Sequence, residues 1–310
     1  MRIVFMGTPE SAVPSLQRLL QDGHDIAAVW TQPDRPAGRG DRMHSPPIKE
    51  FALDHELPLE QPLKIKVEPA KALFASYAAD VAVVVAYGRI LPPEYLHAPR
   101  RGCINVHFSL LPLYRGAAPA NWAIVNGETK TGVTTMFIEE ELDSGPILLQ
   151  RETGIAERET APELMHRLSL SGADLLSETL DQLDTLTPRP QRSDEATFAP
   201  MLKKEDGIID WYRDAGHIER CVRGLQPWPT AFTSHHGRRL IIWKASAETC
   251  GLAAQPGEVV FAHGDDLLVK CGDATALRVF ELQPEAKRRM SVRDFLNGTH
   301  LKVGDRFGQV

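Results

Sequence analysis

The sequence contains few cysteines and no long hydrophobic run. Four of its 310 residues are cysteines, and none of them forms a CxxC motif. This pattern suggests neither a disulfide framework nor a zinc site, so we expect reduced thiols. The longest apolar runs, such as residues 80–88, are too short to cross a bilayer, and the first ten residues predict a strand and a turn rather than a signal peptide. We therefore expect a cytoplasmic protein without a membrane partner.

The composition that remains is typical of a globular protein, with 43% hydrophobic and 25% charged residues. A chain of this length exceeds the usual size of a single core, which favours one large and one smaller domain. The net charge of −6 is unevenly spread: residues 1–199 carry 19 Lys and Arg against 27 Asp and Glu, whereas residues 200–310 carry 16 against 14. The second part is thus the better candidate for binding a polyanion, although an ordinary solvated surface would have the same composition.

Short runs rich in β-branched residues alternate with segments of helical spacing in the first part of the chain. The runs are residues 2–6, 25–31, 80–87 and 102–108, and the helical segments include 15–23 and 68–78. This alternation predicts the α/β class, with a doubly wound, mostly parallel, Rossmann-like sheet. Two further strands, at 131–140 and 147–155, are expected to pair at one edge. A long amphipathic helix at 159–183 is expected to pack on the sheet and complete the domain.

The pattern changes after this helix. Residues 186–207 are rich in proline and charge and lack apolar periodicity, which predicts a linker. Beyond the linker, a helix near 215–225 precedes several short alternating strands, which favours a small C-terminal OB-like β-barrel. The predicted division is a catalytic domain at 1–188, a linker at 189–207 and a C-terminal domain at 208–310.

Two polar side chains lie near the carboxyl end of one of the predicted strands. Asn105 and His107 lie two residues apart, so they point to the same side of the strand. Ligands of open α/β sheets bind outside the carboxyl ends of the strands, and Asp143 follows in a turn before a later strand. An amide, an imidazole and a carboxylate at such a place can polarise a carbonyl, donate to an oxyanion and move a proton. The competing interpretation, in which these side chains only cap a loop and form an Asx turn, fits the spacing equally well.

No nucleophile from the protein accompanies this set convincingly. Ser109 lacks the G-x-S-x-G elbow, and Cys103 precedes the strand end by several residues. The turn GTPE at 7–10 follows the first strand but has neither a G-x-G-x-x-G pattern nor a Walker lysine, which argues against a dinucleotide site. The set suits direct attack by a substrate nucleophile on an activated carbonyl, a reaction for which no metal is required.

Several motifs together resemble the folate-dependent formyltransferase family. They are NVHFSLLPLYRGAAP at 105–119 and TGVTTMFIEEELDSGPIL at 131–148, with FMGTPE, TQPDRPAGRG, VVVAYGRILP, IDW and LQPWPTAF elsewhere along the chain. No single piece is specific, but the combination covers nearly the whole sequence. The resemblance implies an enzyme that transfers a formyl group from the co-substrate 10-formyltetrahydrofolate to an amine.

Matching positions carry the family's site residues onto this sequence. The resemblance makes Asn105, His107 and Asp143 the catalytic set. It also places the folate against the SLLP and YGRIL segments, where the candidate contacts are Ser109, Leu110, Leu111, Pro112, Tyr87, Arg89, Ile90 and Leu91. Phe108 departs from the family pattern, because relatives often carry a small residue or proline after the histidine.

The resemblance further implies initiator methionyl-tRNA as the acceptor of the formyl group. In the family, the insertion at 32–45 enters the acceptor end of the tRNA, and arginines there can grip phosphates and stack on bases. Composition alone predicts a solvated surface loop at this place. The candidate tRNA contacts are Arg35, Arg39, Arg42, Lys203 and Lys204.

Two other functions remain open at the level of sequence. The same catalytic set would serve a formyltransferase that acts on a small-molecule amine, although such an acceptor needs neither the arginine-rich loop nor the barrel. A noncatalytic RNA-binding protein would need the barrel but not Asn105, His107 and Asp143 together. For the tRNA-dependent enzyme we expect a monomer.

Overall fold

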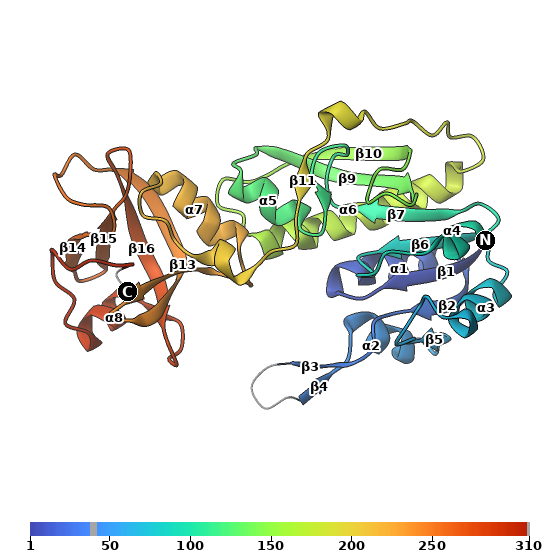
Figure 1. Ribbon diagram of the computed structural model, residues 1–310, viewed down its shortest axis with the longest axis horizontal. Coiled ribbons are helices and arrows are strands. Elements are labelled where there is room, and N and C mark those ends of the chain that lie inside the picture. The colour runs from blue at the N-terminus through green and yellow to red at the C-terminus, as the bar shows by residue number, and fades with distance from the viewer. Residues whose placement is uncertain (38–41, 309–310) are drawn as a thin grey trace. The chain divides into compact units, whose positions relative to one another are not determined.

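The computed structural model describes residues 1–37 and 42–308, and these form two compact units (Figure 1). The first unit comprises three segments, Met1–Pro119, Lys130–Gly154 and Met165–Pro200. The second comprises Ala120–Thr129, Ile155–Leu164 and Met201–Val310. The chain therefore crosses between the units more than once, which a single linear boundary does not describe.

A seven-stranded sheet forms the centre of the first unit, in the order β10-β9-β7-β6-β1-β2-β5 (Figure 1). The strands from β7 to β5 run parallel, whereas β9 is antiparallel to β7 and β10 is antiparallel to β9. This arrangement confirms the predicted doubly wound, mostly parallel sheet and the predicted pairing at its edge. The strands are β1 (Arg2–Gly7), β2 (Asp25–Trp30), β5 (Leu59–Glu60), β6 (Val81–Val85), β7 (Cys103–His107), β9 (Lys130–Phe137) and β10 (Ile147–Gly154).

Helices cover both faces of this sheet because its central strands are apolar on both sides. On one face, Arg18 of α1 (Val13–Gln21) donates a 3.0 Å hydrogen bond from Nη2 to Ser177 Oγ of α6 (Ala161–Gln182). On the other face, Trp30 packs edge to face on Phe74 of α3 (Glu68–Ser76) and on Tyr95 of α4 (Pro93–His97). The long helix predicted after the second edge strand is thus present as α6.

Several short elements of the first unit have no signal in the hydrophobic pattern. They are η1 (Glu10–Ala12), α2 (Pro47–Asp54), the hairpin β3 (Arg35–Ala37) and β4 (Arg42–His44), β8 (Arg115–Gly116), η2 (Ser193–Glu195) and β11 (Phe198–Ala199). Strand β11 pairs in parallel with β8, and Arg189 exchanges two 2.8 Å backbone hydrogen bonds with Ile147. The first part of the segment that composition predicts as a linker is therefore fastened to the first unit.

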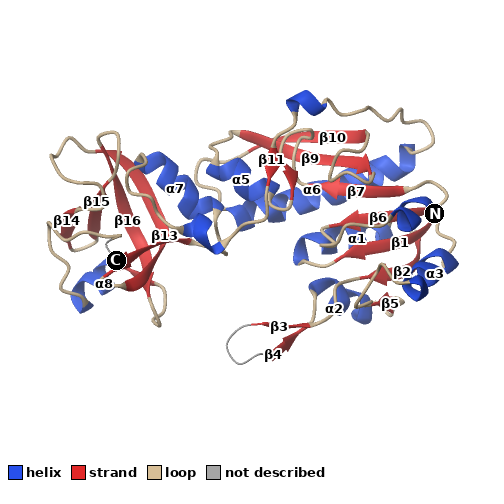
Figure 2. Ribbon diagram, viewed as in Figure 1, coloured by secondary structure: helices blue, strands red, loops and turns tan. Residues whose placement is uncertain are grey.

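An antiparallel sheet surrounds the core of the second unit (Figure 2). Its strands are β12 (Ala231–His235), β13 (Arg238–Thr249), β14 (Val259–His263), β15 (Asp266–Lys270), β16 (Thr275–Pro284) and β17 (Met290–Ser291). The helices are α5 (Pro119–Val125), η3 (Lys204–Gly207), α7 (Ala215–Gly224) and α8 (Val292–Gly298). Trp211, Leu277, Phe295 and Phe307 are buried together inside it. The unit has the predicted OB-like character.

None of the helices within the described ranges combines the length and the apolar composition needed to cross a bilayer.

Candidate active site

Strand β7 carries two polar side chains at its carboxyl end, between two neighbouring strands. Asn105 lies opposite Val84 of β6 and Met136 of β9, and His107 lies opposite Thr134 of β9. Since side chains alternate along a strand, Asn105 and His107 share one face of the sheet. The side chain of Val106 lies on the other face, against Gly172 of α6. The sequence expectation for the direction of these two side chains is confirmed.

The protonation pattern of His107 follows from its contacts. Its side chain is buried, and Nε2 lies 2.9 Å from the backbone carbonyl oxygen of Tyr114. A carbonyl oxygen can only accept a hydrogen bond, so Nε2 must carry a proton. In the neutral imidazole this leaves Nδ1 unprotonated, and Nδ1 lies 3.7 Å from Oδ2 of Asp143. In the neutral ring Nδ1 is therefore the nitrogen with an acceptor lone pair.

Asp143 comes from the loop between β9 and β10. Its backbone has φ +50°, a left-handed conformation that is uncommon for a residue other than glycine. Its Oδ2 accepts a 2.8 Å hydrogen bond from the backbone N–H of Gly116. Across the described residues, the carboxamide of the half-buried Asn105 makes no hydrogen bond to another side chain or to the backbone. The structure thus brings His107 and Asp143 together and leaves the Asn105 amide able to bind a ligand.

The SLLP loop follows β7 directly and is fixed by two polar side chains. Thr134 Oγ1 donates to Ser109 O (2.7 Å) and accepts from the Leu111 N–H (3.1 Å). Gln150 Nε2 donates to Leu111 O (2.8 Å) and to Thr134 Oγ1 (3.0 Å). The Leu111–Pro112 peptide is cis, and the Ser109 hydroxyl donates to the carbonyl of Leu113. Ser109 therefore shapes the loop rather than offering a free hydroxyl.

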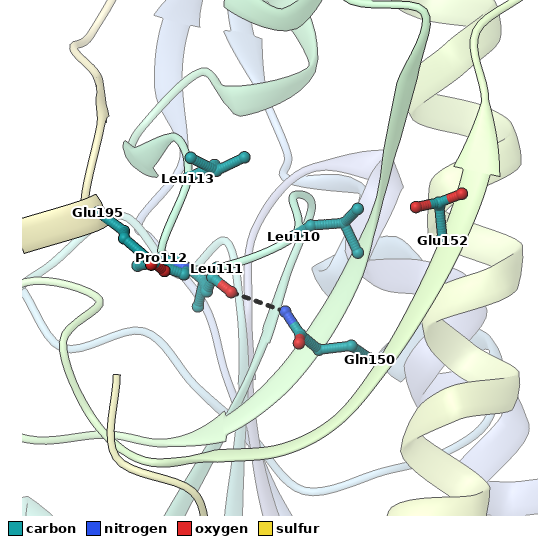
Figure 3. Close-up of a pocket in the computed structure, with 7 residues that line it drawn as sticks. All are labelled: Leu110, Leu111, Pro112, Leu113, Gln150, Glu152 and Glu195. Atoms are coloured by element: carbon teal, nitrogen blue, oxygen red, sulfur yellow. Dashed lines mark hydrogen bonds between the residues drawn. The ribbon is translucent and has the colours of Figure 1, made fainter. Parts of the chain in front are cut away.

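A pocket of about 700 Å³ opens beside this loop (Figure 3). Its lining combines apolar leucines with the Gln150 amide and two carboxylates, of which Glu195 lies beside Pro112. The carboxylates are paired, Glu152 with Lys130 at 2.8 Å and Glu195 with Arg192 at 2.7 Å. The lining residues are Leu110, Leu111, Pro112, Leu113, Gln150, Glu152 and Glu195. Its volume is in the range of pockets that hold small organic ligands.

The YGRIL segment lies elsewhere and does not line this pocket. Tyr87 and Leu91 are buried in the core beside Trp30. Burial raises the pKa of Tyr87 to about 12, and its hydroxyl has no partner among the described residues. Arg89 donates from Nε to Gln32 Oε1 at 3.1 Å, and Ile90 is 70% exposed. Of these four side chains, only those of Arg89 and Ile90 are open to a ligand.

Phe108, the departure from the family pattern, is accommodated by the core. Its side chain is buried and lies against Gly172 of α6, where an added Cβ would come within 3.4 Å of the ring. The aromatic ring thus points away from the face of β7 that carries Asn105 and His107.

The residues expected to contact tRNA lie on two separate segments. Arg35 is exposed in β3 and donates from Nη2 to Gln32 Oε1 at 3.3 Å, and Arg42 lies in β4. Arg39 lies outside the described residues. Lys203 and Lys204 are exposed at the start of η3, in the second unit.

Two glutamines near these sites have no signal in the sequence. Gln32 is buried and bonds Arg35, Arg89 and the Tyr87 carbonyl, the last through Nε2 at 3.1 Å. Gln191, in the predicted linker, bonds the backbone of the Asp143 loop. Polar residues of this kind have no periodicity that would mark them, so only the folded structure identifies them.

The strand that carries Asn105 and His107 begins with a cysteine. Cys103 is buried, burial raises the pKa of its thiol to about 12, and the thiol donates to the Tyr95 carbonyl. Such a thiol is a poor nucleophile. Residues 1–37 and 42–308 contain no group of three or more His, Cys, Asp or Glu side chains arranged to hold a metal ion.

Comparison with known proteins gives consistent matches over both units. The family described as "Formyl transferase" matches residues 1–180, and "Formyl transferase, C-terminal domain" matches residues 201–300. A methionyl-tRNA formyltransferase of Geobacter metallireducens is 47% identical over 99% of this chain and 98% of its own length. Another, from Caldanaerobacter subterraneus subsp. tengcongensis, is 48% identical over 98% of this chain and 99% of its own length.

Solved structures share the fold at lower sequence identity. An N-formyltransferase from Helicobacter canadensis, in complex with folinic acid and dTDP-3-aminofucose, superposes with a TM-score of 0.64. The superposition covers 91% of this chain and 98% of that protein's chain, and the two sequences are 17% identical. At this sequence identity the similarity shows a shared fold only, and it does not show which acceptor this chain uses.

Proposed function

Because the chain belongs to the methionyl-tRNA formyltransferases of the formyl transferase family, we propose that it formylates the α-amino group of initiator methionyl-tRNA. The formyl donor is 10-formyltetrahydrofolate, as the sequence resemblance implies. The observation that carries the proposal is the His107–Asp143 pair beside the Asn105 amide, at the carboxyl end of β7.

The residues around the SLLP loop fit a folate. A pterin and its aminobenzoyl linker are flat and largely apolar, and Leu110 and Leu113 offer apolar side chains beside the Gln150 amide, whereas the Leu111 side chain is buried with Met136 and Ile147. Arg89 and Ile90 are the accessible members of the other predicted segment. When bound, the folate supplies a formyl group already activated on nitrogen. Three further predicted folate contacts have buried side chains, so they shape the backbone around the folate instead of contacting it with their side chains. They are Ser109, Tyr87 and Leu91.

The catalytic set handles charge and protons while the substrate amine attacks the formyl carbon. Asn105 donates to the oxygen on which negative charge develops, and one such donor is typically worth about 3 kcal/mol in the barrier. His107 accepts the amine proton at Nδ1, since Nε2 is committed to the Tyr114 carbonyl. Asp143 stabilises the imidazolium that forms, while the Tyr114 carbonyl holds the ring in position. The carbon–nitrogen bond to the folate then breaks, and the proton held on His107 passes to the departing folate nitrogen, so that the imidazole is neutral again.

Binding of the tRNA is proposed for the segments that carry exposed basic residues. Arg35 is exposed in β3, Arg42 lies in the backbone of β4, and Arg39 lies outside the described residues. Lys203 and Lys204 are exposed at the start of η3. We propose residues 1–188 as the folate-binding catalytic domain, 189–207 as the connecting segment and 208–310 as the tRNA-binding domain, in a monomeric cytoplasmic enzyme. Lys203 and Lys204 fall within that connecting segment.

A formylation assay tests the proposal. The purified protein is given 10-formyltetrahydrofolate with charged initiator tRNA or charged elongator tRNA, and N-formylmethionine is measured after deacylation. We expect donor-dependent formylation that favours the initiator. An absence of formyl transfer to either tRNA would exclude the proposed function.

A further inference from the structure

The segment 189–199 has a second role besides connecting the units. It lies within the first unit and is held there by backbone bonds of Arg189 and Thr197 and by the pairing of β11 with β8. The N–H of Arg115 donates to Thr197 O at 2.8 Å, and the N–H of Tyr114 donates to Thr197 Oγ1 at 2.8 Å. Tyr114 is also the residue whose carbonyl fixes His107. The segment therefore supports the wall of the candidate active site.

Gln191 uses both ends of its side-chain amide in this segment. Its Nε2 donates to Asp143 O and to Gly145 O, both at 2.8 Å. Its Oε1 accepts from Nε (3.0 Å) and Nη2 (2.8 Å) of Arg115, which is 3% exposed. Carbonyl oxygens only accept and a guanidinium only donates, so these four bonds allow one orientation of the amide.

The loop that carries Asp143 needs such a support. Asp143 adopts φ +50°, and Gly145 passes so close to Phe137 O that an added Cβ would lie 2.0 Å from it. A backbone held in an uncommon conformation persists when its surroundings overdetermine it. Gln191 holds the loop's carbonyls, and Gly116 of β8 holds the Asp143 carboxylate at 2.8 Å. Both anchors of Asp143 thus depend on residues 191–199, directly or through β8.

We propose that Gln191 is a positioning residue that holds Asp143 against His107, so that part of the predicted linker completes the active site. This inference rests on the proposed function, because it assigns Gln191 a role in formyl transfer. Gln191 acts through Asp143. Its loss therefore lowers kcat and leaves the affinities for the folate and the tRNA unchanged. A displacement of about 1 Å in a catalytic group can cost about a hundredfold in rate.

Two variants separate positioning from simple stabilisation. Gln191→Ala removes these four bonds, together with a longer contact from Nε2 to Met136 Sδ at 3.8 Å, and leaves the buried Arg115 without the Gln191 acceptor. Gln191→Glu keeps an acceptor for Arg115 but loses the N–H donors to Asp143 O and Gly145 O. Gln182→Ala, at the exposed end of α6, is the matched control. Steady-state kcat and both KM values are measured for each, with circular dichroism as a check of folding.

We expect Gln191→Ala and Gln191→Glu to lower kcat by about 10- to 100-fold and to leave both KM values near those of the parent. The control Gln182→Ala should have the kinetics of the parent. Parental kcat in Gln191→Glu would overturn the proposal, because the donor bonds would then be dispensable. A raised KM with unchanged kcat would overturn it as well. Should Gln191→Ala fail to fold, Gln191→Glu alone decides. An inactive parent protein would instead count against the proposed function.

Discussion

His107 has two differently committed nitrogens, and this asymmetry predicts how its variants behave. Because Nε2 donates to Tyr114 O, only Nδ1 can accept the substrate proton. We expect His107→Ala to lower kcat by about 10²- to 10⁴-fold, the usual contribution of general acid–base catalysis. Asp143→Ala should lower kcat as well. Rates are measured with both substrates saturating, and His97→Ala, on the exposed surface of α4, serves as the control.

Both variants should fold, since neither opens a large cavity in the hydrophobic core. Turnover near the parental value in either one would remove the pair from the mechanism.

The sequence predicts some of these residues and not others. Asn105 and His107 have the two-residue spacing of one strand face, and that spacing predicts their common direction without knowledge of the fold. The pattern suggests that Asp143 lies near them but fits a simple loop cap equally well, because the carboxylate belongs to a loop 36 residues after His107. The resemblance to the family favours the catalytic grouping. The hydrogen bonds of His107 to Tyr114 and of Asp143 to Gly116 depend on the conformation of the loop after β7, which no periodicity encodes.

At the scale of elements, the SLLP loop should matter to the folate and not to the tRNA. Leu110 lines the pocket and packs over Gly132. A Cβ added to Gly132 would lie 2.5 Å from the Leu110 side chain. Full burial of a leucine contributes about 1.5–3 kcal/mol, so we expect Leu110→Ala to weaken folate binding by about tenfold or more. Binding of each ligand is measured separately, with Leu170→Ala of α6 as the control. A loss confined to tRNA binding would refute the assignment.

The pairing of β8 with β11 gives a second prediction at this scale. Gly116 has φ +125°, and an added Cβ would lie 2.5 Å from Ala199 O. Gly116→Ala should therefore strain the pairing, at a cost of about 1–3 kcal/mol, and displace the N–H that holds Asp143. We expect a lower melting temperature together with slower formyl transfer. Gly251→Ala, where the added Cβ meets nothing within 4 Å, should leave both unchanged.

A Gly116→Ala protein with parental stability and rate would show that the two strands tolerate separation. It would also show that the Gly116 N–H is not needed by Asp143.

Long elements were predictable from the sequence, and short ones were not. The longer strands of both sheets and helix α6 have many apolar residues with a regular period, so their type follows from the pattern alone. The two-residue strands β5, β8 and β11 are defined by tertiary pairing. Composition predicts a linker at 186–207 because proline and charge dominate there, yet residues 189–199 find their partners on the first unit.

At the scale of the whole molecule, the second unit should become less stable in mild acid. Burial lowers the pKa of His217, with Arg213 and Arg220 adding to the effect, and burial followed by His236 lowers the pKa of His235. Both histidines therefore bind a proton more readily in the unfolded chain. Their contribution to stability is complete above the unfolded pKa of about 6.5 and is lost as the pH falls below it.

Melting temperatures at pH 7.5 and pH 5.5 check this. The parent should lose more stability over this interval than a His217→Gln, His235→Gln double variant, whereas the two proteins should respond alike between pH 7.5 and pH 8.5. An equal loss in acid would show that other groups control it.

The choice of acceptor tests the central claim most directly. The parent protein receives 10-formyltetrahydrofolate labelled in the formyl group, with initiator methionyl-tRNA and an amino-sugar nucleotide competing at equal concentration, and the label in each product is counted. If the end of β7 and Asp143 act on methionyl-tRNA, nearly all the label should be found in N-formylmethionyl-tRNA. Label found mainly in the amino sugar would contradict the account and assign the same catalytic set to a small-molecule amine.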